Sequence, residues 1–184
     1  MTVVLEDGGV RLRLAVQDDV DYLVGLAASE EVEPFLAGVS PWGADDVRAD
    51  IVRARTEPEA GARLVLEIRD GAGWRPAGGL AYAVQNRRSR IVYLYGVMLD
   101  PSVRGKGLAE RAVRLVAAHL VRDRGYHRVQ LEVYGFNERA LRLFERAGFV
   151  REGAKRQAYW RHGTWHDGVM FGLVEEDLAE PSEG

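Results

Sequence analysis

Alternating apolar and polar residues predict strands along much of this chain. Residues 10–16, 63–70 and 128–134 carry apolar side chains at every second position, which is typical of strands buried on one face. Residues 91–99, IVYLYGVML, are almost entirely apolar, as expected for a central strand covered on both faces. The pattern predicts three further strands at residues 75–85, 149–160 and 165–174.

Apolar residues at helical spacing predict four helices between these strands. They cover residues 20–28, a segment beginning near Asp45 or Asp46, residues 107–124 and residues 137–148. The second helix is expected to bury Val47, Ile51 and Val52 on its inner face.

This order of elements predicts an α/β (α+β) fold in one domain. Seven strands and about four helices form it, with a strand–helix–strand crossover in the middle. The domain is expected to span residues 1–184, and the acidic end, residues 176–184, is expected to be frayed.

Composition narrows the classes of protein that remain. The net charge of −3 and the pI near 5.9 argue against a nucleic-acid partner. The absence of cysteine excludes disulfides, thiolate metal sites and a cysteine nucleophile, and it fits a cytoplasmic location. No apolar run reaches the length that spans a membrane, so no membrane partner is expected.

Residues 104–109, RGKGLA, form a basic, glycine-rich turn between the apolar strand and the third helix. The first amides of a helix lack acceptors within the helix, and the helix dipole makes this end attractive to anions. Gly105 and Gly107 would let a phosphate approach the backbone, while Arg104 and Lys106 add positive charge. The turn therefore predicts a pyrophosphate site.

Two familiar phosphate loops do not match this turn. A P-loop needs Lys followed by Ser or Thr after its last glycine, but Leu108 follows Gly107. A dinucleotide-binding fingerprint needs a third glycine where this chain has Glu110. Taken alone, the turn also fits a plain strand-to-helix connection that uses glycine for its geometry.

A second motif removes much of this ambiguity. Residues 137–149, NERALRLFERAGF, have Asn137 as the expected helix N-cap and Gly148 as the expected stop. Together the two motifs resemble those of the GNAT acetyltransferase superfamily, in which Arg104, Gly107 and Ala109 would fill the fixed positions of the acyl-CoA motif. The chain most resembles the branch that includes ribosomal-protein N-terminal (RimJ/RimL-like) acetyltransferases and several small-amine acetyltransferases.

The resemblance implies a mostly antiparallel sheet in which strand 91–99 splays from strand 128–134. It implies transfer of acetyl from acetyl-CoA to a primary amine of a small molecule or a peptide N-terminus, without a metal. Pantetheine would pair with the first strand, and the diphosphate would lie on the glycine turn. The implied cofactor-binding residues are Val97, Met98, Leu99, Arg104, Gly105, Lys106, Gly107, Leu108, Ala109, Asn137 and Phe144.

Glu132 is the candidate base of this reaction, because the amine must lose its proton before it attacks. It lies on the less apolar face of its strand and matches a proton acceptor of some N-terminal acetyltransferases. Equally, it could be an ordinary salt-bridged strand residue. Leu94 stands where relatives often carry a carboxylate, so one common base position is empty.

Phe144 occupies the position where the family often has a tyrosine that protonates the leaving thiolate. The catalytic candidates that could replace it are Tyr134 and Tyr159, ahead of Tyr93 and Tyr95. For each of them, packing on a sheet is the alternative interpretation. The missing hydroxyl also leaves open an acyl-CoA-binding sensor or scaffold without turnover, or a domain that uses another acyl donor.

Other aromatic and histidine residues have weaker interpretations. His162, His166 and Asp167 lack a convincing third metal ligand, so they are interpreted as hairpin or substrate-rim residues. Phe35 and Trp42 lie in the region that lines the acceptor pocket in the family, and core packing explains them equally well. The segment of residues 159–168 could serve a homodimer.

Overall fold

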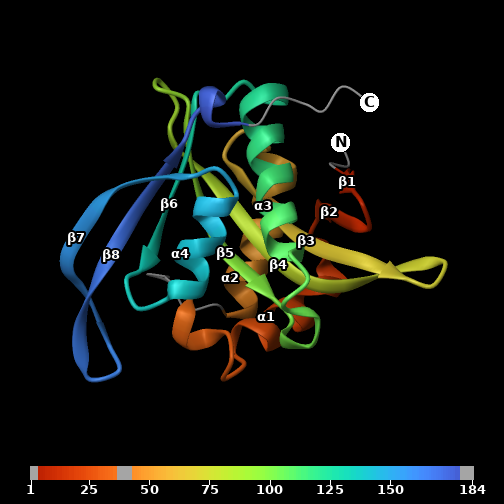
Figure 1. The fold of residues 1–184 in the computed structure, drawn as a ribbon. Helices are drawn as coiled ribbons and strands as arrows, with labels where there is room; N and C mark the ends of the chain where they lie inside the picture. Colours follow the sequence, from red (N-terminus) through yellow and green to blue (C-terminus); the bar gives the residue numbers. More distant parts are fainter. Residues whose placement is uncertain (1–3, 37–42, 179–184) are drawn as a thin grey trace.

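The computed structural model describes residues 4–36 and 43–178, which form a mixed sheet between two pairs of helices (Figure 1). The strands lie in the order β1-β2-β3-β4-β5-β6-β8-β7. Their bounds are β1 Val4–Asp7, β2 Val10–Leu14, β3 Gly61–Asp70, β4 Gly73–Asn86, β5 Ile91–Leu99, β6 Arg128–Tyr134, β7 Val150–Arg161 and β8 Thr164–Leu173.

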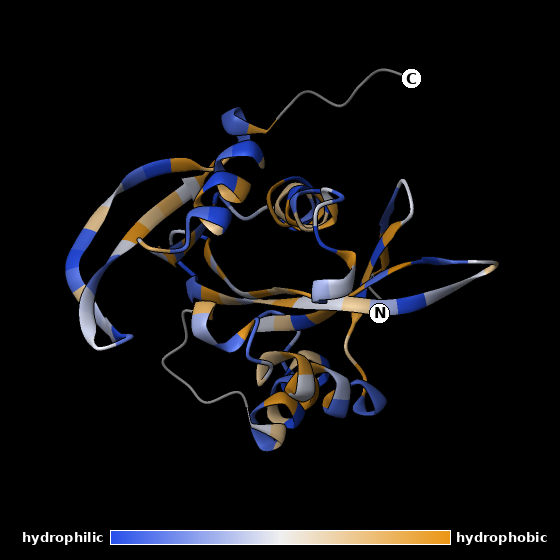
Figure 2. Ribbon diagram, turned by 60° about the horizontal axis from the view of Figure 1, so that its bottom comes forward, coloured by the Kyte–Doolittle hydropathy of each residue, from blue (hydrophilic) through white to orange (hydrophobic). Residues whose placement is uncertain are grey.

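Helices cover both faces of the sheet, with apolar residues turned toward it (Figure 2). Helices α1 (Val20–Ala27) and α2 (Ala44–Thr56) pack on one face, and α3 (Leu108–Ala118) and α4 (Glu138–Arg146) pack on the other. β3 shows why both faces are apolar, since Leu64 joins the core under α3 whereas Val65 joins the core under α1 and α2.

β5 and β6 are the only parallel neighbours among the described strands, and they soon separate. Their register contains three residue pairs, from Ile91 with Arg128 to Tyr93 with Gln130. Beyond Tyr93, β5 keeps its antiparallel pairing with β4, where Gly79 faces Met98. The splayed strand pair expected from the resemblance is therefore confirmed.

The fold class is confirmed, while several boundaries differ from those expected. The described sheet has eight strands instead of seven, because the short, largely exposed β1 pairs with β2. α3 ends at Ala118 and continues as a π-helical turn, His119–Asp123. Val52 is 58% exposed, because α2 turns Val47 and Ile51 toward the sheet and Val52 away from it.

The last described residues include a short 3-10 turn, Glu175–Asp177, in which the Asp177 side chain accepts a hydrogen bond from the Val174 amide at 3.0 Å. Residues 179–184 of the acidic end lie outside the described residues, as does Trp42. In the described ranges, no helix has the length and apolar character needed to cross a membrane.

Candidate functional site

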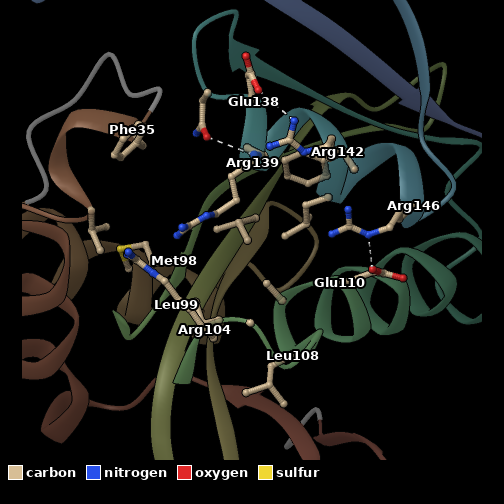
Figure 3. A pocket seen from close by; sticks show the side chains of 18 of the residues that line it. Phe35, Met98, Leu99, Arg104, Leu108, Glu110, Glu138, Arg139, Arg142 and Arg146 are labelled. Carbon is tan, nitrogen blue, oxygen red and sulfur yellow. Dashed lines mark hydrogen bonds and ion pairs between the residues drawn. The ribbon is translucent and has the colours of Figure 1, made fainter. Parts of the chain in front are cut away.

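A cleft of about 850 Å³ opens where β5 and β6 diverge, between the start of α3 and α4 (Figure 3). The segment after α1 forms its opposite side, with Phe35 among the lining residues. The cleft is also lined by ten of the residues that the resemblance implied: Val97, Met98, Leu99, Arg104, Gly105, Gly107, Leu108, Ala109, Asn137 and Phe144. Lys106 is exposed and does not line it.

The turn before α3 presents backbone amides to this cleft. The first helical bond runs from the Arg111 amide to the Gly107 carbonyl at 3.1 Å, so the amides of the preceding residues have no acceptor in the helix. Gly105 and Gly107 have φ values of +82° and +71°, a region that favours glycine. A Cβ at either position would point into open space. The turn thus leaves room for an anion close to its backbone.

The end of β5 contributes a free strand edge to the same cleft. Met98 and Leu99 pair with Gly79 and Gly78 of β4 on one side, and Val97 lies in an irregularity of this pairing. Their other side has no strand partner in the described part of the chain, because the pairing of β5 with β6 ends at Tyr93. An extended ligand could therefore hydrogen-bond along this edge in place of a strand.

Arginine side chains from α4 and from the turn before α3 surround the cleft mouth. Arg104 donates to the Glu31 carbonyl at 3.1 Å, Arg142 pairs with Glu138 at 3.0 Å, and Arg146 pairs with Glu110 at 2.8 Å. Arg139 also lines the cleft, as Figure 3 shows, and has no ion pair among the described residues. Sequence reasoning missed these arginines of α4, although their spacing in NERALRLFER offered the signal.

Asn137 and Phe144 hold α4 against the cleft in different ways. The Asn137 side chain accepts a hydrogen bond from the Ala140 amide at 3.2 Å, which confirms its role as N-cap. Phe144 is buried and packs edge-on against Phe149 at 5.6 Å between ring centroids. Phe136 also lines the cleft, although the sequence reasoning did not single it out. Its position between β6 and Asn137 is the sequence feature that could have indicated this.

The three predicted catalytic residues lie outside the residues that line the cleft. Glu132 pairs through Oε2 with Lys155 Nζ at 2.5 Å, and its side chain is 5% exposed. The Tyr134 hydroxyl accepts a hydrogen bond from Arg161 Nε at 3.0 Å. Tyr159 packs edge-on against Tyr134, at 4.9 Å between ring centroids. The three residues form one cluster, joined to the cleft by Phe136, which stacks on Tyr134.

Burial keeps the nearby tyrosine hydroxyls protonated. Burial, and after it the Glu132 carboxylate, raises the pKa of Tyr93 to about 12. Burial and the same carboxylate raise the pKa of Tyr159 further above its usual range. Leu94 lies on the opposite face of β5, fully buried in the core beneath α3. At neutral pH, Tyr93 and Tyr159 can therefore donate hydrogen bonds but do not act as bases.

The two histidines of the last hairpin contact the ring of Phe136, which lines the cleft. The His166 ring lies 4.5 Å from Phe136 and the His162 ring 5.2 Å, measured between centroids. Asp167 instead accepts a hydrogen bond from the Gln157 amide at 2.8 Å. Phe35 contacts the same Phe136 ring at 6.1 Å, so this aromatic group marks one end of the cleft.

The comparison with known families gives this geometry its context. Residues 14–149 match the Acetyltransferase (GNAT) family. The chain belongs to the GNAT acetyltransferase family. The divergent strands, the glycine turn before α3 and the Asn137-capped α4 are the parts of this GNAT chain that build its cleft.

Individual relatives match only part of this GNAT chain. It is 32% identical, over 93 residues, to an uncharacterized N-acetyltransferase, YokL, of the SPbeta prophage in Bacillus subtilis, covering 50% of this chain and 52% of YokL. The chain spans about half or less of the length of the curated relatives it matches.

Two solved structures share the fold at 19% identity. One is a chimera of the spermidine N-acetyltransferase SpeG from Vibrio cholerae with hSSAT, at a TM-score of 0.79 over 94% of this chain and 100% of that one. The other is RimL, a ribosomal L7/L12 alpha-N-protein acetyltransferase in complex with coenzyme A. Its TM-score is 0.78 over 94% of this chain and 98% of that chain. This likeness shows that the three chains share one fold.

Proposed function

We propose that this GNAT domain transfers an acetyl group from acetyl-CoA to a primary amine of a small molecule or a peptide N-terminus. The observation that carries the proposal is the cleft that runs from the free edge of β5 to the open amides around Gly107. The edge suits an extended amide chain, and the turn suits a diphosphate. Acetyl-CoA has both groups in this order.

The residues around the cleft match the parts of the donor. Pantetheine would pair with Val97 to Leu99, and the diphosphate would accept hydrogen bonds from the amides of residues 105–109, since the Arg104 amide already donates to the Pro101 carbonyl; Lys106 adds charge from outside. Arg139, which has no described ion pair, is available for a further phosphate. Asn137 and Phe144 would border the pantetheine arm from α4.

The reaction that we propose is a direct attack. The amine nitrogen attacks the thioester carbon, the carbon–sulfur bond breaks, and coenzyme A leaves as a thiolate. Glu132 is the proposed acceptor of the amine proton, and the amides of Val97 and Met98 are the proposed donors to the thioester oxygen. Phe144 offers no proton to the thiolate. Tyr159, beside Glu132, holds a proton at neutral pH and is our candidate donor, ahead of Tyr134.

A cytoplasmic location and a homodimer complete the proposal. The cysteine-free composition suits a reducing compartment. Trp160 and Trp165 pack together near the tip of the β7–β8 hairpin and are 57% and 55% exposed, which supports this hairpin as the contact between two copies.

The test is release of free coenzyme A thiol from acetyl-CoA in the presence of small amines and N-terminal peptides. We expect release that depends on one class of acceptor. Absence of release with every acceptor, while calorimetry detects acetyl-CoA binding, would contradict the proposed transfer and favour an acyl-CoA sensor.

Gly107→Trp tests the position of the donor in the same assay. The indole would fill the space proposed for the diphosphate, so we expect acetyl-CoA affinity to fall about 100-fold or more. Gly71→Trp is the matched control, because Gly71 also has a positive φ, +58°, and open space at its Cβ, but lies in the β3–β4 turn. Equal binding by both variants would place the donor elsewhere.

A further inference from the structure

Glu132 carries a carboxylate oxygen that lacks a partner in the interior of the protein. Oε2 pairs with Lys155, whereas Oε1 is buried and has no hydrogen-bond partner among the described residues. A buried, unsatisfied carboxylate oxygen is costly, because its hydration is lost without replacement. The described residues do not supply the missing donor, so a water molecule or a ligand must provide it.

The surroundings of this carboxylate suit a cation. A Cβ on Gly168 of β8 would lie 2.0 Å from Oε1, so the missing side chain leaves space for the carboxylate. Tyr93 from β5 and Tyr159 from β7 lie beside it, since burial and then the Glu132 carboxylate raise the pKa of both hydroxyls, at Tyr159 through a side-chain hydrogen bond as well as through charge. A carboxylate beside tyrosine rings is a favourable environment for an ammonium group.

Lys155 already places such an ammonium group there, at the end of a side chain that lies largely in solvent. Its side chain is 55% exposed, and it projects from β7, the edge strand of the sheet. The regular pairing of β7 with β8 is interrupted between Lys155 and Tyr159. The exposed Lys155 side chain can move into solvent, but the buried Glu132 carboxylate needs a counter-charge, so Lys155 leaves only when another cation takes its place.

We propose that the Lys155 ammonium occupies the subsite for the acceptor's primary ammonium, and that the acceptor displaces it on binding. The exchange replaces one ammonium by another at the same carboxylate, so the net charge of the site is unchanged. The substrate class is an unhindered alkyl primary amine, which resembles the Lys155 stem. This inference rests on the proposed function, since it takes Glu132 to face the acceptor.

The displacement can be measured without turnover. Lys106 and Lys155 are the two lysines of the chain, so a protein grown with 13C,15N-lysine gives one ε-methylene carbon signal from each of them in an NMR spectrum. The spectrum of Lys155→Met assigns them. On titration with n-butylammonium, we expect the Lys155 signal to move toward the position of free lysine while Lys106 stays unchanged. n-Butanol is the neutral control and should move neither.

Kinetics supply the second test, once the thiol-release assay has identified an acceptor. Lys155→Met removes the competing ammonium, so the acceptor KM should fall about five-fold at an unchanged acetyl-CoA KM. Arg151→Met is the matched control, since Arg151 is an exposed cation of the same strand without a described contact to Glu132.

The outcomes separate the inference from the proposed function. A Lys155 signal unmoved by n-butylammonium, or a higher acceptor KM in Lys155→Met, would overturn the displacement and make Lys155 a fixed support of Glu132. Absence of thiol release with every acceptor would contradict the transfer activity, and the NMR titration would still decide the subsite.

Discussion

Phe144 shows how one side chain can limit a reaction. Its ring lines the cleft and packs against Phe149 and Phe171, so its position is rigid. It has no hydroxyl with which to protonate a thiolate. A hydroxyl added at the para carbon would be the smallest change that tests whether the reaction lacks an acid.

We expect Phe144→Tyr to raise kcat for acetyl transfer about ten-fold, less than the 10²- to 10⁴-fold that a sole general acid contributes, because Tyr159 is already our candidate donor. Phe149→Tyr is the control, because Phe149 is 3% exposed and does not line the cleft. There the buried hydroxyl should lower the free energy of unfolding by about 1–3 kcal/mol without a gain in kcat. An unchanged kcat in a folded Phe144→Tyr protein would mean that the thiolate leaves without this acid.

At the residue scale, the sequence predicted those roles that depend only on neighbouring residues in the chain. Asn137 as N-cap and Gly107 with positive φ follow from neighbours in the chain, and both stand where the motifs indicated. Phe136 and Arg139 were missed, because they reach the cleft only through the packing of α4 against the rest of the domain. Glu132 was placed on the correct, less apolar face, but its pairing with Lys155 depends on β7, two strands away.

At the scale of elements, a buried ion pair ties the start of α1 to the sheet. Asp19 is 5% exposed, accepts hydrogen bonds from Arg13 of β2 at 2.7 and 2.8 Å, and accepts one from the Val16 amide at 2.7 Å. Arg13 also bonds Glu67 of β3 at 3.0 Å. Three elements therefore meet at one guanidinium group.

We expect Asp19→Asn to lower the free energy of unfolding by about 3 kcal/mol, because it leaves Arg13 without its closest counter-charge. Asp18→Asn is the matched control. Asp18 is exposed and adjacent, and its substitution should change stability by less than about 0.5 kcal/mol. Urea unfolding of both variants checks the difference, and equal stabilities would show that the pair adds nothing.

The same pair predicts how stability depends on pH. Burial by itself would raise the pKa of Asp19, but the bonds from Arg13 and Val16 outweigh it and lower the pKa. A carboxylate with a lowered pKa stabilises the fold above its unfolded pKa, about 3.9, and the contribution is lost as the pH falls through the folded pKa. Between pH 6 and pH 3, the wild type should therefore lose more stability than Asp19→Asn.

Elements differ in how far the sequence determines them. β5 and β6 were expected in place, because their apolar patterns are strong. β1 was not expected, because VLED is short and mostly exposed, and only its pairing with β2 makes it a strand. Val52 was predicted to face inward because it is apolar and follows Ile51, but it lies on the side of α2 opposite to Val47.

At the scale of the whole molecule, the sheet has a weak point at its centre. Three residue pairs join β5 to β6, and beyond them the cleft separates the five strands β1 to β5 from β6, β8 and β7. A ligand that pairs with the free edge of β5 and touches α4 would connect the two parts. Binding should therefore stabilise the molecule locally as well as globally.

Acetyl-CoA at 100 times its Kd should raise the free energy of unfolding by about 2.7 kcal/mol. Hydrogen exchange should slow at Leu94 to Leu99 and at the start of α3, while amides of β2 and β3 keep their rates. Thermal denaturation and exchange with mass spectrometry measure both effects. Uniform protection along the sheet would contradict binding at the splayed strands.

The position of β8 has a consequence for how the protein is made. Every residue that lines the cleft precedes residue 147 in the chain, but β6 has no partner on its outer edge until β8, Thr164–Leu173, is added. Strands β1 to β5 are consecutive neighbours and can pair as synthesis proceeds. A nascent chain that already contains all the cleft residues still exposes an open strand edge. The cleft is completed last, by residues that do not line it.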